Sequence, residues 1–300
     1  MPLESGSQRG CGQKYVVVTP ARDEGGHIRN TVESMQHQSL PPRQWIVVDD
    51  GSRDGTGEIL DRYARKIDWL RVVHRADRGF RSAGGGVIDA FYAGYAFLED
   101  DWDFVVKLDG DVSFAADYFE KALANFDAEP QLGIAGGLVC RRENGSLKVD
   151  SATDPPFHVR GATKIYRRAC WEQIGPLASA PGWDTIDEVK ANFHGWHTRT
   201  FRDLPLIQHK PTGSADGNWR NWFKNGRANY VTGYHPLFLL AKCGRRAFSR
   251  RPFLMESTAL FAGFTSGYLR RIPRGADTDV VRYLRRQQLR RLSGRPSIYA

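Results

Sequence analysis

The feature that most constrains this chain is an apolar run that ends in two acids. The β-prone residues 104–108 lead directly into Asp109, Gly110 and Asp111. Side chains two apart in an extended chain point to the same side, so both carboxylates can converge on one hard cation, and Gly110 lets a ligand's phosphates approach the backbone. A plain turn is the alternative, because Asp-Gly is a common turn dipeptide. A second acidic strand end, residues 45–49 followed by Asp50, favours the cation site.

Apolar runs alternate with helical periodicity up to residue 111. We predict strands at 15–19, 45–49, 70–74 and 104–108, and helices near 28–35, 54–65 and 83–99. This alternation predicts a parallel sheet with helices on both faces and a ligand site beyond the carboxyl ends of the strands. The polar clusters lie at those ends, at residues 20–24, 49–52, 75–81 and 109–111.

Charge is unevenly distributed along the chain. Residues 220–300 contain 17 Lys and Arg against 3 Asp and Glu, a net +14, whereas the remaining residues sum to −5. A basic C-terminal region on an acidic body indicates an anionic membrane surface or another polyanion as a neighbour, and no nucleic acid is expected. The four cysteines lack the spacing of a zinc site or a disulfide framework, and residues 1–13 lack an apolar signal region. We therefore expect a cytoplasmic protein with a flexible tail at residues 1–13.

Three motifs in order carry a resemblance to a known family. Residues 19–24 (Thr-Pro-Ala-Arg-Asp-Glu), 49–52 (Asp-Asp-Gly-Ser) and 109–111 resemble the nucleotide-sugar half of family 2 glycosyltransferases. The resemblance implies an α/β GT-A fold, Rossmann-like, with a mixed sheet flanked by helices. It also implies an inverting, metal-dependent hexosyltransferase that uses a nucleotide-sugar donor and Mn²⁺ or Mg²⁺. It divides residues 14–241 into a donor half, 14–111, and an acceptor half, 112–241, and residues 242–300 then form a basic helical extension.

The resemblance implies roles for residues around the nucleotide. Thr19 and Glu24 match first-loop positions near it, and Asp50 matches the carboxylate that accepts a hydrogen bond from the base. An Asx turn is the alternative for Asp50. In the loop at 75–82, we expect Arg81 to contact the diphosphate, with a solvated arginine as the alternative.

The metal residues follow from the same resemblance. Asp109 is expected to face the ribose and the cation, and Asp111 the cation and the diphosphate. His209 follows the last predicted strand, where family members often supply a third metal ligand, and imidazole suits Mn²⁺ better than Mg²⁺.

The catalytic base stays open between two aspartates. In the family an acidic pair opens a helix about eleven residues before a glycine, and counting back from Gly195 selects Asp184. Trp183 stands where the pair normally has an acid, and Asp187 with Glu188 offers an acidic pair one turn later. Either Asp184 or Asp187 could take a proton from an attacking hydroxyl. An N-cap is the structural alternative for Asp184.

The tail is aromatic and basic, and it contains no run of about 20 uncharged apolar residues. Residues 254–269 come closest, and we expect them to lie in a membrane interface while arginines bind anionic headgroups. Amphipathic helices packed on the body are the alternative. By analogy the acceptor is a sugar or a lipid-linked molecule at the inner face of the cell membrane, used in surface polysaccharide or glycolipid synthesis.

Two other functions remain as alternatives. A sugar-1-phosphate nucleotidylyltransferase shares the α/β plan but should have a Gly-rich basic loop after its first strand, which residues 19–24 lack. A non-catalytic polyanion-binding protein would explain the basic tail but not the acidic strand ends.

Overall fold

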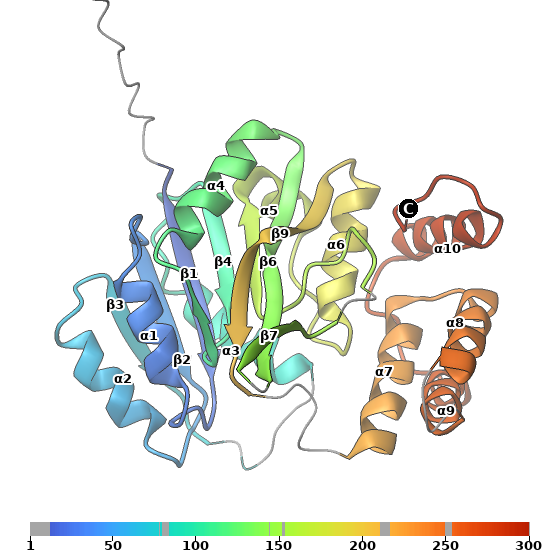
Figure 1. The fold of residues 1–300 in the computed structure, drawn as a ribbon, viewed down its shortest axis with the longest axis horizontal. Helices are drawn as coiled ribbons and strands as arrows, with labels where there is room; N and C mark the ends of the chain where they lie inside the picture. The colour runs from blue at the N-terminus through green and yellow to red at the C-terminus, as the bar shows by residue number, and fades with distance from the viewer. Residues whose placement is uncertain are drawn as a thin grey trace, which may run out of the picture.

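One mixed sheet with helices on both faces forms the body of the protein, and a group of helices lies at one side (Figure 1). The computed structural model describes residues 13–77, 79, 84–143, 145–151, 154–210, 217–249 and 254–299. The strands are β1 (Tyr15–Ala21), β2 (Gln44–Asp49), β3 (Leu70–His74), β4 (Phe104–Leu108), β5 (Val112–Phe114), β6 (Leu132–Glu143), β7 (Ser146–Val149), β8 (Thr163–Arg167) and β9 (His197–Gln208). The helices are α1 (Ile28–Gln36), α2 (Thr56–Ala64), α3 (Gly85–Tyr95), α4 (Tyr118–Ala128), α5 (Arg168–Ile174), α6 (Trp183–Phe193), α7 (Asn218–Thr232), α8 (Pro236–Ser249), α9 (Met255–Leu269) and α10 (Thr278–Leu292).

The order of the strands brings the acidic motifs to one edge. It runs β3-β2-β1-β4-β8-β6-β9-β5, with β7 paired to β6. The first four strands are parallel, and Ala21 lies opposite Asp49, which lies opposite His74. The carboxyl ends of these strands therefore meet, as the alternation predicts. β8 continues the sheet antiparallel to β4, so the sheet is mixed, as expected for the GT-A fold.

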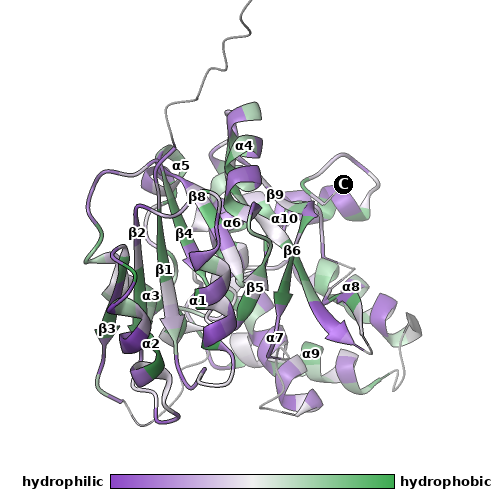
Figure 2. Ribbon diagram, turned by 60° about the vertical axis from the view of Figure 1, so that its left-hand side comes forward, coloured by the Kyte–Doolittle hydropathy of each residue, from purple (hydrophilic) through white to green (hydrophobic). Residues whose placement is uncertain are grey.

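Side-chain alternation along the strands builds two cores. Val17 and Trp45 point to the face covered by α1, α2 and α4, whereas Val16 and Ile46 point to the face covered by α3, α5 and α6. Hydrophobic residues accordingly dominate the central strands, and the surrounding helices carry hydrophilic stretches (Figure 2). The strands predicted at 70–74 and 104–108 have those bounds in the structure.

The C-terminal helices pack on one another and on α6. Their core contains Tyr230 of α7, Leu239 of α8 and Leu260 of α9, together with Ile186 of α6. α7 and α9 approach so closely that a Cβ on Gly226 would overlap the carbonyl oxygen of Leu260. The boundary expected at residue 241 lies inside α8, and within the described residues no helix is both long and apolar enough to cross a membrane.

Candidate active site

Glu24 lies in the loop after β1, and Lys210, just beyond β9, contacts this loop. The Nζ of Lys210, just beyond β9, lies 2.9 Å from Oε1 of Glu24 and donates to the carbonyl oxygen of Asp23 at 3.2 Å. The other carboxylate oxygen of Glu24 is buried and has no hydrogen-bond partner within the described residues. Burial raises the pKa of Glu24, and the Lys210 ammonium opposes that shift. One oxygen of the Glu24 carboxylate is therefore paired with Lys210, and the other is buried at the strand ends without a hydrogen-bond partner within the described residues.

Thr19 lies in the sheet interior instead of at the edge. Its side chain is inaccessible to solvent, and its hydroxyl accepts a hydrogen bond of 2.9 Å from the indole Nε1 of Trp45. In this structure Thr19 stabilises the packing of β1 against β2, so a contact of its side chain with a nucleotide requires this arrangement to open.

Asp49 and Asp50 have different roles: one forms the turn after β2, and the other presents a buried carboxylate at the strand ends. Asp49 accepts a hydrogen bond from the backbone N–H of Ser52 at 3.0 Å and therefore makes the Asx turn. Asp50 is buried, and its Oδ1 accepts a hydrogen bond of 2.9 Å from the Arg75 guanidinium. The turn alternative thus applies to Asp49, and the carboxylate of Asp50 is oriented by an arginine from the end of β3.

The loop after β3 packs against the loops after β1 and β2. The Arg22 guanidinium donates to the Asp50 carbonyl oxygen at 2.9 Å and to the Asp77 carboxylate at 2.6 Å. A Cβ on Gly51, whose φ is +73°, would overlap the backbone of Asp77, so this contact requires glycine. Arg81, the expected diphosphate contact, lies outside the described residues.

Asp109 and Asp111 lie in the turn between β4 and β5. Asp109 forms an ion pair with the buried Lys107, whose ammonium also donates to the Gly161 carbonyl oxygen. Asp111 is 5 % exposed. Burial raises the pKa of Asp111 to about 7, and the Asp109 and Glu24 carboxylates contribute to the increase. The edge therefore concentrates negative charge at a poorly solvated carboxylate.

This acidic group fits a hard divalent cation by its donor chemistry. Carboxylate oxygens are the ligands that Mg²⁺ and Mn²⁺ prefer, and a cation would offset both the burial and the carboxylate repulsion that raise the Asp111 pKa. Mg²⁺ usually takes one or two carboxylates and completes its shell with phosphates and water. Within the described residues no three or more His, Cys, Asp or Glu side chains converge on one point, so ligand oxygens must supply the other positions.

His209 and Gly110 occupy positions that differ in part from expectation. The backbone N–H of His209 donates to the Asp111 carbonyl oxygen at 2.8 Å, but its Nε2 lies 2.9 Å from Ser113 Oγ, and its ring stacks on His27. Burial lowers the pKa of His209, which favours the neutral form that binds metals. A Cβ on Gly110 would lie 3.0 Å from Ile28 and 3.6 Å from Glu24, so this glycine permits the close packing of α1, and the approach of phosphates to its backbone stays a prediction.

Asp184 lies in the first turn of α6. The N-cap is Gly182 with φ +84°, so the N-cap alternative for Asp184 is wrong. A Cβ on Gly161 would contact both Trp183 and Asp184, and the Gly161 carbonyl oxygen accepts from Lys107. Within the part of the chain that the structure describes, no hydrogen bond or ion pair restrains the partly exposed Asp184 carboxylate. Gly161 and Lys107 thus connect Asp184 to the turn that contains Asp109.

Asp187 lies in the interior. Both its oxygens accept from the Lys164 ammonium, at 2.8 and 2.9 Å, and Tyr166 donates to Oδ2 at 2.6 Å. The Lys164 side chain is fully buried and also pairs with Glu188 at 2.8 Å. The geometry therefore favours Asp184 over Asp187 as a group that an acceptor can reach. Lys164 also donates to the carbonyl oxygen of Asp184, so this buried network fixes the start of α6.

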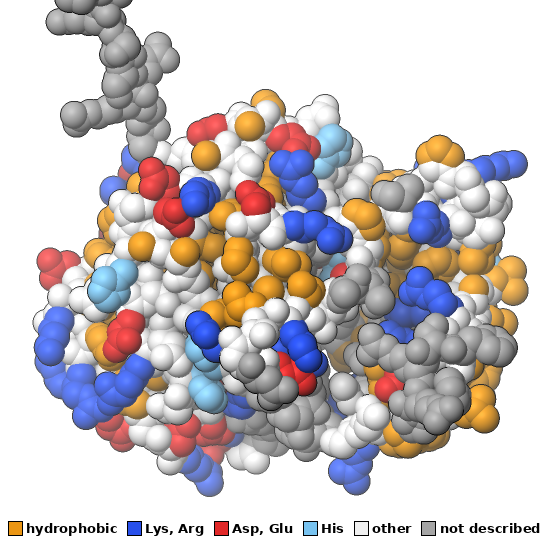
Figure 3. All heavy atoms as spheres, viewed as in Figure 1, with side chains coloured by type: hydrophobic (Ala, Val, Ile, Leu, Met, Phe, Trp, Pro, Cys, Tyr) orange, Lys and Arg blue, Asp and Glu red, His pale blue; other side chains and the backbone are white. Residues whose placement is uncertain are grey.

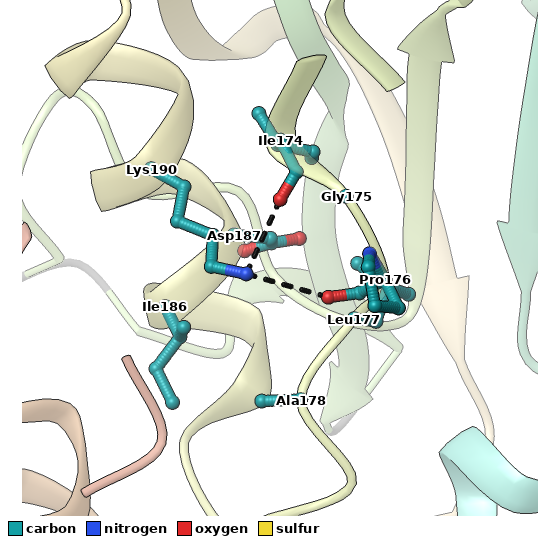
Figure 4. A pocket seen from close by; sticks show the side chains of 8 residues that line it. All are labelled: Ile174, Gly175, Pro176, Leu177, Ala178, Ile186, Asp187 and Lys190. Atoms are coloured by element: carbon teal, nitrogen blue, oxygen red, sulfur yellow. Dashed lines mark hydrogen bonds between the residues drawn. The ribbon is translucent and has the colours of Figure 1, made fainter. Parts of the chain in front are cut away.

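A shallow hollow lies between the α5–α6 connection and α6 (Figure 4). It has no room for a water molecule, and Lys190 spans it by donating to the carbonyl oxygens of Ile174 and Pro176. Apolar side chains and Lys190 form most of its lining, so the hollow is a small packing defect next to Asp187 and not a ligand pocket.

Sequence reasoning missed the lysines that pair with the site's acids. Lys107, Lys164 and Lys210 each contact a carboxylate at or beneath the strand ends. Lys107 and Lys164 interrupt β-prone runs, and lysine is almost never fully buried without a partner. That anomaly was the available signal. Lys107 pairs with Asp109, two residues along the chain, whereas Lys164 pairs with Asp187, 23 residues later.

The chain belongs to glycosyl transferase family 2, whose model matches residues 16–175. It is 32% identical over 129 residues to the polyprenol monophosphomannose synthase of Mycolicibacterium smegmatis, covering 42% of this chain and 46% of the relative. It is 25% identical over 126 residues to the poly-beta-1,6-N-acetyl-D-glucosamine synthase of Staphylococcus epidermidis, covering 42% of this chain and 28% of the relative. The chain thus spans less than half the length of these relatives. Family membership supports the glycosyltransferase interpretation over the nucleotidylyltransferase alternative.

Solved structures show the same fold. A mannosyltransferase from Pyrobaculum calidifontis, in complex with GDP-Man and Mn²⁺, superposes with a TM-score of 0.58 at 17% identity, over 91% of this chain and 79% of that chain. Residues 1–349 of S. aureus TarS in complex with UDP-GlcNAc superpose with a TM-score of 0.55 at 17% identity, over 87% and 76%. These similarities confirm the expected GT-A fold.

Proposed function

We propose that this protein is an inverting glycosyltransferase that moves a sugar from a nucleotide diphosphate sugar to an acceptor hydroxyl. The observation that carries the proposal is the buried Asp111 carboxylate among Asp109 and Glu24 at the ends of parallel strands. Family membership and neighbours whose titles name GDP-Man and UDP-GlcNAc support a nucleotide-sugar donor.

The donor half binds and orients the nucleotide in this proposal. Asp50, held by Arg75, accepts a hydrogen bond from an N–H of the base. Thr19 anchors β1 just before the first loop, Glu24 lies in that loop, and Arg81 adds a guanidinium toward the diphosphate. Glu24 and its Lys210 partner then tie the acceptor half to the nucleotide side.

Asp109 and Asp111 would hold a divalent cation, Mn²⁺ or Mg²⁺, and His209 would become a third ligand by turning its ring away from Ser113. When bound, the cation supplies charge neutralisation to the leaving diphosphate. Lys107 holds one oxygen of Asp109 in place, which leaves the orientation of that carboxylate fixed before donor binding.

Asp184 acts as the general base. Its carboxylate takes the proton from the acceptor hydroxyl as that oxygen attacks the anomeric carbon on the face opposite the diphosphate. The sugar–phosphate bond breaks as the new glycosidic bond forms, so one displacement inverts the anomeric configuration. The Lys164 network supports the role of Asp184 because it fixes the backbone of the first turn of α6.

The acceptor is a lipid-linked molecule or a sugar in this proposal, and the protein works peripherally at the inner face of the cell membrane, in surface polysaccharide or glycolipid synthesis. Two observations support this part. One relative is named a polyprenol monophosphomannose synthase, and the C-terminal helices expose large apolar side chains, including Leu237 and Leu269.

Asp111→Asn tests the proposal. We expect loss of turnover and of metal-dependent nucleotide binding, while the far-UV circular dichroism spectrum stays unchanged, because the amide removes the charge with little change in shape. Binding is measured by calorimetric titration with UDP and GDP, with and without Mn²⁺. Asp117→Asn, at an exposed acid that starts α4, is the control. Normal activity of Asp111→Asn at saturating Mn²⁺ contradicts the assignment.

A further inference from the structure

His74, the last residue of β3, lies between two carboxylates. Its Nδ1 lies 3.1 Å from Oδ2 of Asp49, at the end of β2, and its Nε2 lies 3.1 Å from Oδ1 of Asp61, on α2. A neutral imidazole has one N–H, so it can donate to only one of these carboxylates and would turn a lone pair toward the other. An imidazolium has two N–H groups and can donate to both. The geometry therefore fits the charged ring.

The charged groups around the His74 ring favour its protonation. Burial alone would lower the pKa of His74, but the hydrogen bonds and the charges of Asp49 and Asp61 outweigh it and raise the pKa. The other charged side chains on the body of α2, Glu58 and Arg62, are exposed to solvent. Figure 3 shows Lys and Arg side chains at the surface around α2, at the lower left of the molecule. The two carboxylates that contact the ring therefore dominate its electrostatic environment.

Asp49 depends on His74 for charge compensation. The Asp49 side chain is 9% exposed, whereas the His74 side chain is 48% exposed. In the part of the chain that the structure describes, no other cation pairs with Asp49. A Cβ on Gly57 of α2 would lie 2.7 Å from Oδ2 of Asp49 and 3.2 Å from Cε1 of His74, so the α2 backbone covers one side of this pair. Whichever nitrogen keeps its proton, a neutral ring leaves the buried Asp49 charge uncompensated.

Two consecutive residues, His74 and Arg75, hold the turn that presents Asp50. His74 contacts Oδ2 of Asp49, and Oδ1 of the same carboxylate accepts from the backbone N–H of Ser52 at 3.0 Å and closes the turn. Arg75 donates to the Asp50 carboxylate at 2.9 Å, and its backbone N–H donates to the Asp49 carbonyl oxygen at 2.8 Å. The His74 ring thus acts on the residue that precedes Asp50.

We propose that His74 is a positioning residue for nucleobase recognition: as an imidazolium it holds the turn at Asp49 in the form in which Asp50 meets the base. This inference rests on the proposed function and adds a dependence on pH to it. The apparent affinity for a nucleotide scales with the fraction of molecules that have the binding-competent turn. The support from the charged ring is complete below about pH 6.5, the ordinary pKa of histidine, and is lost as pH rises through the raised pKa of His74.

The test measures the affinities of the full chain for UDP and for GDP, each with Mn²⁺, by calorimetric titration at pH 6 and pH 8.5. His74→Gln should weaken binding by about threefold to fivefold at pH 6, as expected for the loss of a partly exposed ion pair, and by less than about twofold at pH 8.5. The ratio of wild type to variant is compared at each pH. Other titrating groups, such as Asp111 and the diphosphate, are common to both proteins and cancel in this ratio.

Two further variants separate the proposed role from general effects. His197→Gln is the matched control, because His197 also lies against a carboxylate, that of Glu129 at 2.6 Å, but at the start of β9. It should leave both affinities unchanged. Asp61→Asn should weaken binding by about twofold to threefold at pH 6 and should add nothing to His74→Gln, because Asp61 acts on the turn only through the ring.

A loss in His74→Gln that is the same at pH 6 and pH 8.5 indicates a merely structural ring and overturns the inference. So does an Asp61→Asn loss that is equal with and without His74. If His74→Gln does not fold, Asp61→Asn decides alone: a loss at pH 6 that disappears at pH 8.5 supports the proposal, and no loss at pH 6 overturns it. A protein that binds neither UDP nor GDP with Mn²⁺ contradicts the proposed function itself, so the two failures are distinguishable.

Discussion

At the scale of single residues, the acids near the acceptor side differ in what surrounds them. Asp184 is partly exposed, whereas Asp187 is 2% exposed and bonded to Lys164 and Tyr166. Asp184→Asn should lower kcat by about 10²–10⁴ with nucleotide affinity near wild type. Asp187→Asn should instead lower the free energy of unfolding by about 3–5 kcal/mol, because it leaves Lys164 buried with less compensation. Steady-state kinetics and urea unfolding of both variants separate the roles; a stable, inactive Asp187→Asn would reverse them.

His158 gives the site a pH dependence. Burial alone would lower its pKa, but the Glu188 carboxylate, 2.9 Å from Nδ1, raises the pKa to about 9. A pKa above the unfolded value means that this stabilisation is complete below about pH 6.5 and is lost as pH rises to about 9. His158→Gln should therefore cost about 1–3 kcal/mol at pH 6 and little at pH 9.5, as measured by urea unfolding. An equal cost at both pH values would contradict the ion pair.

Residue types at strand ends could be predicted, whereas their partners could not. The motif around Asp50 indicated an acid at the cleft, but only the structure shows that Asp49 makes the turn and that Arg75 orients Asp50. The choice between Asp184 and Asp187 depends on which side of α6 faces Lys164, which lies on a strand 20 residues earlier. Pairings of this kind depend on strand order, which local sequence patterns do not encode.

At the scale of elements, the short-range patterns were sufficient for β3 and β4, whose bounds match the prediction, but not for the tail. Residues 254–269 read as an interfacial segment because they are apolar, yet α9 uses Gly263 and Gly267 to pack on α7 while Phe261 stays 45% exposed. One face of α9 therefore packs on the body, as the second alternative expects, and contact of its exposed face with a membrane stays a prediction.

The contact between α7 and α9 gives a prediction for two glycines. Gly226→Ala should lower the free energy of unfolding by about 1–3 kcal/mol, because its Cβ would overlap the carbonyl oxygen of Leu260. Gly244→Ala, in α8, is the matched control: a Cβ there meets nothing within 4 Å, so alanine should be neutral or stabilise by up to about 1 kcal/mol. Thermal unfolding of both variants provides the measurement, and equal effects would mean that the helices are not in contact.

At the scale of the whole molecule, the basic and apolar surface of the C-terminal helices predicts binding to anionic vesicles. Sedimentation with phosphatidylglycerol vesicles should decrease as salt rises, because each Lys or Arg near the surface contributes about 1 kcal/mol that ions screen. Leu237→Glu with Leu240→Glu should abolish binding, whereas Leu292→Glu, 44% exposed on α10, should not. A sedimenting fraction that changes neither with salt nor with the two leucine substitutions would argue against a membrane role for α8.

The contact between Glu24 and Lys210 has a consequence for the order of synthesis. The two residues are 186 positions apart, and β6 likewise pairs with β9, which precedes Lys210 (Figure 1). During translation the loop that contains Glu24 is therefore synthesised long before Lys210, the cation that pairs with it. In the same way, β4 is synthesised before its partner strand β8. We therefore expect a nascent chain that ends before β8 to expose the unpaired edge of β4.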